Sequence, residues 1–353
     1  MNRVIVLWSM IAAILAGCKD DPLPVLPPDS IPTTKGVYVL NEGDFGDPTG
    51  ARLTFYDPVT DSVFKNVYEN ANDDQSLGSL GDDMILSDGK LYITMSGSGE
   101  IKVLDIQTHK VLQTKLLIGE DPHDLCIDKQ RSRLYVTRLF KNSLFVLNLT
   151  DLSVLDSITV GTNPLGMRLV DSLLFVCNSG YGNDNRVSII NVNTNEVTKT
   201  VQVGYGPSSA VVHGDKVYVA CSGNAFTNPA VNGSVYSISI AAKSVVDTIA
   251  IDENLLGISG IGTDGMMYVA GSASGSFYGG PIHKIDLAMK TVMKNFISGT
   301  YYGLGIDEAN GDFYLADAKN FASDGEVNIY SKNGQYVKKF SAQRGPAVFA
   351  FKR

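Results

Sequence analysis

Residues 134–161 read LYVTRLFKNSLFVLNLTDLSVLDSITVG, and this stretch decides the fold. It holds a Tyr-Val pair at Tyr135, a loop, a second alternating segment that ends near Asn148, a Thr-containing turn and a third segment that ends at Gly161. Alternation of apolar and polar residues with a period of two is typical of β-strands. Residues 134–161 therefore predict three consecutive short strands.

The Tyr-Val pair recurs along the whole chain. Counterparts begin at Tyr38, Tyr92, Tyr135, Phe175, Tyr218, Tyr268 and Tyr314. One further short apolar strand precedes each pair except the first, so that a unit holds four strands, which is the content of one propeller blade. The units run roughly over 36–68, 77–117, 123–160, 165–203, 208–251, 257–297 and 303–341. We therefore predict an all-β, seven-bladed β-propeller of four-stranded blades.

The first unit lacks an innermost strand, and one extra strand pattern remains at the C-terminus, from Ala347 to Lys352. Pairing of this last strand within the first blade would close the ring and leave no long unpaired edges. We expect this closure.

The repeat resembles the YVTN family of β-propellers. Residues 135–137 (YVT), 160–164 (VGTNP) and 203–207 (VGYGP) carry the resemblance, which covers nearly all of residues 36–353. It implies the fold, and it implies little about activity because one fold hosts many functions.

The start of the chain predicts a lipoprotein signal peptide over residues 1–17. Arg3 supplies the positive charge, and residues 4–14 form an apolar segment too short to span a membrane. Residues 15–18 (LAGC) resemble the lipobox of bacterial lipoproteins, which implies cleavage before Cys18 and lipidation of its thiol. More than one acyl chain would give stable attachment.

Residues 19–21 (KDD) resemble the surface-export signal of gut-dwelling Gram-negative bacteria. The resemblance implies an outer-membrane location with the protein facing the cell exterior. Residues 18–35 contain five prolines, which favour extended polyproline II. We expect this segment to be a semi-rigid tether, with the propeller occupying residues 36–353.

Charge and cysteine content narrow the functional classes. The net charge is −8, from 37 acidic and 29 basic residues, which argues against nucleic acid and against a basic membrane-binding surface. We expect membrane contact through the lipid anchor only. Cys126, Cys177 and Cys221 are expected to be buried free thiols, and a Cys177–Cys221 disulfide stays open at this stage.

Aromatic residues recur in the loops that follow the Tyr-Val pairs. Blade topology places these loops on one face together with the connections between blades, so we predict a ligand-binding mouth on that face. Aromatic side chains offer large contact area at low entropic cost, which favours a bulky ligand, although padding between blades would explain single residues. The candidate ligand-binding residues are Asn41, Phe45, Asp121, His123, Arg138, Phe140, Asn178, Tyr181, Phe226, Tyr278, Tyr301, Tyr302, Asp317, Phe321 and Arg344.

Enzyme signatures are weak in this sequence. The four histidines do not converge, and no His-Glu-x-x-His or paired Cys-x-x-Cys pattern occurs. Residues 260–265 (GIGTDG) match a dinucleotide-binding string, but they fall in a β turn with no helix after it. We predict a non-enzymatic protein with no catalytic residues, metal or cofactor.

Residues 36–43 (GVYVLNEG), followed by 53–58 (LTFYDP), are similar to surface lipoproteins of gut bacteria that bind cobalamin (vitamin B12) and cap a TonB-dependent outer-membrane transporter. The resemblance implies a corrinoid ligand that is captured and handed to such a transporter. Two other classes stay open: a carbohydrate-binding or adhesion propeller, and a propeller hydrolase or lactonase. The only Trp, Trp8, lies in the predicted signal peptide, which counts against a sugar site.

Overall fold

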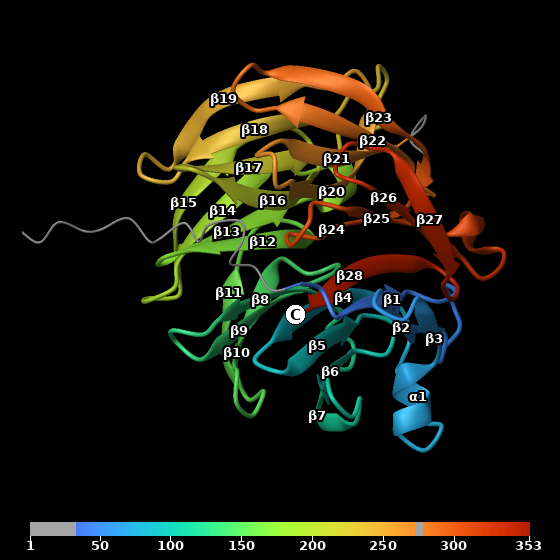
Figure 1. The fold of residues 1–353 in the computed structure, drawn as a ribbon. Helices are drawn as coiled ribbons and strands as arrows, with labels where there is room; N and C mark the ends of the chain where they lie inside the picture. Colours follow the sequence, from blue (N-terminus) through green and yellow to red (C-terminus); the bar gives the residue numbers. More distant parts are fainter. Residues whose placement is uncertain (1–32, 273–277) are drawn as a thin grey trace, which may run out of the picture. The chain divides into compact units, whose positions relative to one another are not determined.

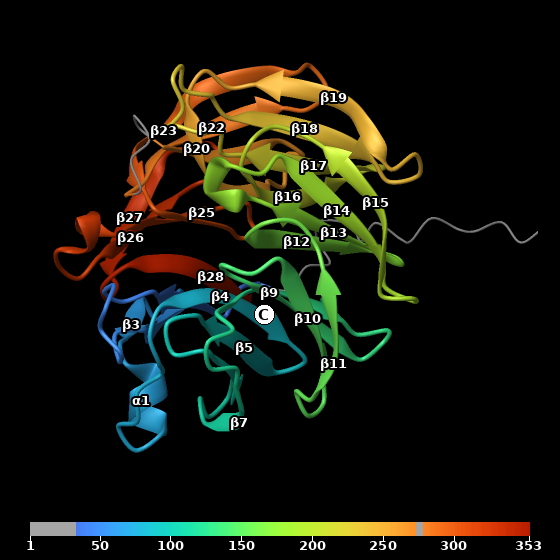
Figure 2. The same cartoon turned by 180° about the vertical axis from the view of Figure 1, so that it is seen from behind.

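The structure is a computed structural model that describes residues 33–272 and 278–353. These residues form seven four-stranded antiparallel sheets, and Figures 1 and 2 show the sheets arranged as blades around a ring. The predicted seven-bladed β-propeller is confirmed. One compact unit spans Thr33–Arg353 and so begins three residues before the predicted domain start. The predicted signal peptide, Cys18 and residues 18–32 of the tether lie outside the described residues.

Each blade is described from its innermost to its outermost strand. Blade 1 consists of β28 (Pro346–Lys352), β1 (Gly36–Asn41), β2 (Arg52–Asp57) and β3 (Ser62–Phe64). Blade 2 consists of β4 (Gly81–Ser87), β5 (Lys90–Met95), β6 (Glu100–Asp105) and β7 (Val111–Leu116). Blade 3 consists of β8 (Pro122–Asp128), β9 (Arg133–Arg138), β10 (Ser143–Asn148) and β11 (Val154–Thr159). Blade 4 consists of β12 (Pro164–Val170), β13 (Leu173–Asn178), β14 (Arg186–Asn191) and β15 (Glu196–Gln202).

Blade 5 consists of β16 (Pro207–His213), β17 (Lys216–Cys221), β18 (Ser234–Ser239) and β19 (Ser244–Ala250). Blade 6 consists of β20 (Asn254–Ile261), β21 (Met267–Ser272), β22 (Gly280–Asp286) and β23 (Thr291–Tyr301). Blade 7 consists of β24 (Gly303–Ile306), β25 (Phe313–Asp317), β26 (Glu326–Tyr330) and β27 (Tyr336–Ser341). One short helix, α1 (Val67–Ala71), lies at the rim beside β3 (Figure 1). None of the helices within 33–272 and 278–353 has the length and apolar character that a membrane span requires.

The Tyr-Val pairs hold neighbouring blades together. Tyr135 packs in the apolar cluster between blades 3 and 4, whereas Val136 packs in the cluster between blades 2 and 3. The side chains of successive strand residues point to opposite faces of a sheet, so one pair serves both interfaces of its blade. The same division holds for Tyr38 and Val39 at the interfaces with blades 2 and 7. Seven such clusters, one at each interface, make up the core.

The C-terminal strand closes the ring as predicted. β28 pairs antiparallel with β1, with Phe349 opposite Val39, and the backbone N–H of Lys35 donates to the carbonyl of Lys352 at 2.8 Å. The buried carboxylate of Asp307 in blade 7 accepts a hydrogen bond from the Thr34 hydroxyl at 2.6 Å and pairs with Arg353 at 2.7 Å. Both chain ends of the propeller are therefore tied to blade 7.

Loops after the second strand of each blade share one face with the connections between blades, and this face is called the binding face below. Backbone hydrogen bonds join the two kinds of loop. Ser96 N–H donates to Leu80 at 3.1 Å, and Ser222 N–H donates to Gly206 at 2.8 Å. The first described residues, from Thr33, lie at the opposite face, because β1 begins there beside the end of β28.

Candidate ligand-binding face

Large aromatic side chains are exposed on the binding face. Phe45 is 92% exposed and Phe226 is 76% exposed, and Phe140, Tyr181 and Tyr278 are each at least half exposed. Two groups of rings are in contact. Phe140 and Tyr181, from blades 3 and 4, have ring centroids 5.7 Å apart, and Phe321 lies 5.0 Å from Tyr302 and 6.4 Å from Tyr278. Exposed apolar surface of this kind marks a surface suited to a ligand or a partner.

Three of these aromatic residues have a left-handed backbone. Phe140, Tyr181 and Phe321 have φ values of 58°, 50° and 60°. A bulky residue rarely adopts this region, and each such residue costs about 1–3 kcal/mol. All three occur in the loop that follows the second strand of their blade. The fold thus holds three aromatic side chains at comparable places in an unfavourable conformation, which is typical of functional sites.

A cluster of titratable side chains, named the mouth cluster here, lies at the centre of the binding face. Its members come from five blades: Glu42, Asp82, His123, Asp124, Tyr181 and Tyr302. His123 Nδ1 lies 2.6 Å from Asp124 Oδ1, and His123 Nε2 lies 3.4 Å from Asp82 Oδ1. Asp82 Oδ2 accepts the backbone N–H of Ser96 at 2.6 Å.

Glu42 belongs to the mouth cluster through two neighbours. The Tyr302 hydroxyl donates to Glu42 Oε2 at 2.8 Å, and Tyr181 interacts electrostatically with both Glu42 and Asp82. Glu42 directly follows β1, and Asp82 and His123 occupy equivalent places near the start of innermost strands β4 and β8. The ring therefore brings side chains from five blades together at the centre of the binding face.

Burial sets the protonation of the mouth cluster. Desolvation raises the pKa of Glu42 to about 7, although the Tyr302 hydrogen bond opposes the shift. Desolvation likewise raises the pKa of Asp82 to about 6. Burial disfavours the charged form of His123, but Asp82 and Asp124 outweigh it and raise the pKa of His123 to about 9. At neutral pH His123 is an imidazolium held between carboxylates.

Other candidate polar residues are already paired on the binding face. Arg138 forms an ion pair with Glu120, donates to Ser143 at 2.7 Å and stacks 4.2 Å above the Phe145 ring. Asp317 binds Lys319 at 2.6 Å, and Arg344 pairs with Asp44. Asp121 has a left-handed backbone at φ 46° and interacts electrostatically with Tyr181.

Three candidate residues do not reach the surface. Asn41 and Asn178 have no exposed area, and Tyr301 is buried in the cluster between blades 6 and 7. Asn41 accepts the N–H of Gln343 at 2.9 Å, Asn178 accepts that of Gly161 at 2.9 Å, and the Tyr301 hydroxyl bonds that of Tyr330 at 2.7 Å. The expectation that they line the mouth is corrected: each side chain turns into its blade to satisfy buried backbone or hydroxyl groups.

The sequence analysis missed Glu42, Asp82, Asp83 and Asp124. A signal was available, because Asp82-Asp83 follows Gly81 and His123-Asp124 follows Pro122 at the starts of equivalent innermost strands. The prediction was built on the aromatic loops, so the acidic residues at these strand starts were not included. Asp83, next to Asp82 in the chain, accepts the N–H of Leu125 from blade 3 at 2.8 Å.

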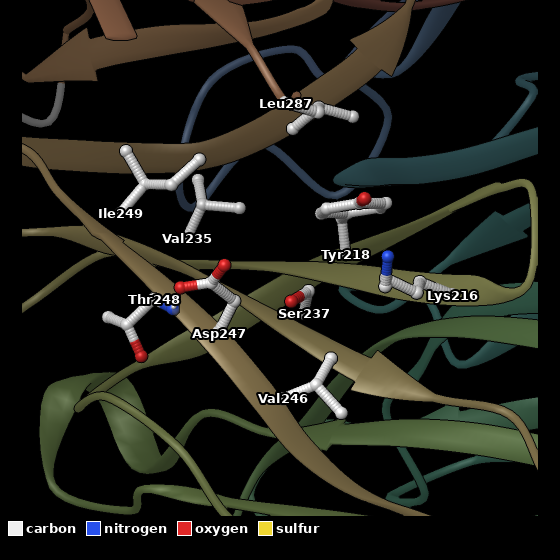
Figure 3. Close-up of a pocket in the computed structure, with 9 residues that line it drawn as sticks. All are labelled: Lys216, Tyr218, Val235, Ser237, Val246, Asp247, Thr248, Ile249 and Leu287. Atoms are coloured by element: carbon white, nitrogen blue, oxygen red, sulfur yellow. Dashed lines mark hydrogen bonds between the residues drawn. The ribbon is translucent and has the colours of Figure 1, made fainter. Parts of the chain in front are cut away.

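A separate cavity of about 210 Å³ lies between blades 5 and 6, away from the mouth cluster. It is lined by Lys216, Tyr218, Val235, Ser237, Val246, Asp247, Thr248, Ile249 and Leu287. Figure 3 shows Leu287, from the turn after β22, facing Val235 and Ile249 of the neighbouring blade. The Ser237 hydroxyl is buried without a hydrogen-bond partner among the described residues.

The described part of the chain contains neither an arranged group of metal ligands nor a disulfide bond. No group of three or more His, Cys, Asp or Glu side chains in residues 33–272 and 278–353 is arranged to hold a metal ion. Cys126, Cys177 and Cys221 are all free, so the Cys177–Cys221 disulfide left open above is not formed. Burial raises the pKa of Cys126 to about 11.

A family described as a domain of unknown function, DUF5074, matches residues 35–224, which is more than half of the chain. The chain belongs to the DUF5074 family. None of the curated proteins matches this DUF5074 protein in sequence.

Solved structures with the same fold are numerous but distant. A quinonprotein alcohol dehydrogenase-like protein from Bacteroides thetaiotaomicron is 15% identical with a TM-score of 0.68, over 90% of this chain and 78% of that one. A candidate 6-phosphogluconolactonase from Bacteroides fragilis is 14% identical with a TM-score of 0.68, over 91% and 98%. The hydrazine synthase of Kuenenia stuttgartiensis is 18% identical with a TM-score of 0.62, over 74% and 85%. Identities this low establish the propeller fold alone.

Proposed function

We propose that this DUF5074 protein is a non-enzymatic cell-surface lipoprotein that captures a corrinoid and hands it to a TonB-dependent outer-membrane transporter. The observation that carries the binding part of the proposal is the set of aromatic residues on one face, five of them at least half exposed, together with the left-handed backbone of Phe140, Tyr181 and the half-buried Phe321. The corrinoid and the transporter come from the resemblance of residues 36–43 and 53–58 to cobalamin-binding surface lipoproteins.

The binding face suits a large flat ligand. Phe140 and Tyr181 form one aromatic wall, and Tyr278, Phe321 and Tyr302 form another on blades 6 and 7. The mouth cluster lies between blades that carry these walls and supplies acceptor oxygens. A corrinoid has an apolar macrocycle for the walls and peripheral amides whose N–H groups suit Glu42 and Asp82.

The location of Thr33, where the described residues begin, fits capture followed by handover. The described chain enters the propeller on the face opposite the aromatic loops. A tether attached there would leave the binding face unobstructed. With Cys18 lipidated, the tether would also keep the protein close to a transporter in the same membrane, so that a high effective concentration replaces diffusion.

Direct titration tests the proposal. The mature chain, from residue 18 with Cys18→Ala, is titrated with cyanocobalamin in a calorimeter, and we expect a Kd below about 1 µM, that is, a binding free energy beyond about −8 kcal/mol. A Phe140→Ala/Tyr181→Ala variant should bind at least tenfold more weakly with an unchanged melting temperature. Absence of heat at micromolar protein, or unchanged affinity in the double variant, would overturn the corrinoid or the site, respectively.

The hydrolase or lactonase alternative predicts turnover, and the carbohydrate alternative predicts sugar binding. Release of acid from lactones by the purified protein, measured with a pH indicator, would favour the former. A glycan array in which sugars bind while cyanocobalamin does not would favour the latter. Either result would replace corrinoid capture.

A further inference from the structure

We infer that the mouth selects its ligand by charge: it accepts a cationic or N–H-donating group at its centre and rejects carboxylates and phosphates. This inference rests on the proposed binding role of the same face, and it is independent of which molecule binds. The charged side chains around the mouth cluster and their ion-pair partners support it.

Negative charge is concentrated at the centre of the face. Glu42 and Asp121 have no basic partner among the described residues. Asp82 and Asp124 share the single imidazolium of His123, and the carboxylate of Asp83 interacts electrostatically with Asp124 and His123. Five carboxyl groups thus face one basic group, which leaves an excess of negative charge above pH 7.

Four of the cations on this face are already neutralised. Arg138 is paired with Glu120, and Arg344 with Asp44. Arg186 binds Asp184 at 2.6 Å, and Lys319 lies 2.6 Å from Asp317 and 3.0 Å from Glu326. A ligand carboxylate or phosphate that approached these four cations would have to displace one of the pairs, and at the centre of the face it would meet the uncompensated carboxylates of the mouth cluster.

The tyrosines strengthen the same preference. Tyr181 is half exposed, and its ring packs against Phe140 next to the carboxylates. Aromatic faces attract cations, and they do so most where a carboxylate is close and water is partly excluded. The hydroxyl of Tyr302 donates to Oε2 of Glu42. The other carboxylate oxygen, Oε1, keeps lone pairs that can accept from a ligand N–H.

Three matched probes test this charge selection without assuming a corrinoid. They share a naphthalene ring and carry charges of +1, 0 and −1: 1-naphthylmethylammonium, 1-naphthalenemethanol and 1-naphthoate. Binding to the mature Cys18→Ala chain is measured at pH 8 by protein-observed NMR shifts. We expect the cation to bind at least tenfold more tightly than the anion, with the alcohol between them.

Replacing the carboxylates by neutral side chains of the same shape tests whether they cause the preference for the cation. In a Glu42→Gln/Asp82→Asn variant, the ratio between cation and anion should fall to within about threefold, with the melting temperature checked at the same pH. Asp215→Asn neutralises one carboxylate on the opposite face, where the Asp215 side chain is 85% exposed, and should leave the ratio unchanged. Equal affinities for cation and anion in the unsubstituted chain, or a ratio that survives the double substitution, overturns the inference.

A corrinoid series separates this inference from the proposed function. Cobalamin monocarboxylic acids replace one peripheral amide by a carboxylate, and we expect them to bind at least tenfold more weakly than cyanocobalamin. If cyanocobalamin does not bind but the naphthyl cation is preferred, corrinoid capture falls and charge selection stands. If cyanocobalamin binds and its acids bind equally well, charge selection falls and corrinoid capture stands.

Discussion

Tyr302 donates a hydrogen bond of 2.8 Å to Glu42 and so joins the last blade to the first at the centre of the binding face. Tyr302 precedes β24, and Glu42 follows β1. The bond favours the charged form of a carboxyl group whose pKa burial has raised to about 7. Glu42 therefore changes its charge in the range where the protein would work, and the protonation of the mouth cluster has consequences for stability.

We predict that the free energy of unfolding decreases as pH rises from 5 to 9. The folded-state pKa values of Glu42, Asp82 and His123 are raised, from 4.5 to about 7, from 3.8 to about 6 and from 6.5 to about 9. The native state therefore binds more protons than the unfolded state, and the stability from each group, full below its unfolded pKa, is lost as pH passes its folded pKa. We expect a loss on the order of 5 kcal/mol, measured by urea unfolding.

Substitutions of Glu42 and of the groups that face it provide the control for this pH dependence. Tyr302, Asp82, His123 and Tyr181 approach it from blades 7, 2, 3 and 4. Glu42→Gln/Asp82→Asn should flatten the profile between pH 5 and 7, and Tyr302→Phe should move the loss associated with Glu42 to higher pH. Stability that stays constant or rises between pH 5 and 9 would contradict this account.

Ring closure makes a second prediction. Deletion of residues 349–353 removes most of the β28–β1 pairing together with the bond between Arg353 and Asp307. Because β28 is also the innermost strand between β24 and β4, we expect an insoluble product or a melting temperature lowered by more than 15 °C. The substitution Arg353→Ala keeps the strand and should cost much less. A truncated chain with a near-native melting temperature would show that the ring does not depend on this strand.

Two buried tyrosines of the repeat make a third prediction. The Tyr38 hydroxyl donates to the Ile106 carbonyl at 3.1 Å and lies 2.9 Å from His109 Nε2, whereas the equivalent Tyr92 hydroxyl has no hydrogen bond to a described residue. Tyr38→Phe removes the hydrogen-bond partner of His109 Nε2, whereas Lys352 still donates to the Ile106 carbonyl at 3.0 Å, so it should destabilise by about 1 kcal/mol. Tyr92→Phe should change stability by less than about 0.5 kcal/mol. Equal effects in urea unfolding would show that these hydrogen bonds contribute nothing.

The fold was predictable because one pair of residues does the same work in every blade. Tyr135 and Val136 point to opposite interfaces, so strand alternation and the repeat period together determined blade number and closure. The predicted strand boundaries lie close to the observed ones for the same reason. The sequence pattern places the last strand at Ala347–Lys352, and the structure places it at Pro346–Lys352.

The site was less predictable, because it depends on which way each side chain turns. Asn41 and Asn178 end their strands beside the mouth, yet both turn inward to bond buried groups. Conversely, Asp82 and His123 belong to innermost strands and meet only through the curvature of the ring. Local patterns identify the face, whereas contact between blades requires the three-dimensional arrangement.

The left-handed backbone at Phe140 makes a fourth prediction, on the relation between stability and binding. A side chain at φ 58° is strained, and glycine alone adopts this region freely. Phe140→Gly should therefore be more stable than Phe140→Ala by about 1 kcal/mol, although both lose the ring contact with Tyr181. Phe45 is exposed on the same face but lies outside the left-handed region, so Phe45→Gly should be less stable than Phe45→Ala.

Chemical unfolding of the four variants measures both differences. If the strain is retained for function, Phe140→Gly should also lose ligand affinity while it gains stability over Phe140→Ala, a trade of stability for activity. Opposite orders at the two positions would support this account, because both residues are exposed phenylalanines on the same face and their backbone conformations differ. If glycine is the less stable substituent at Phe140 as well, the left-handed conformation is not a source of strain, and the main structural argument for a functional aromatic loop is lost.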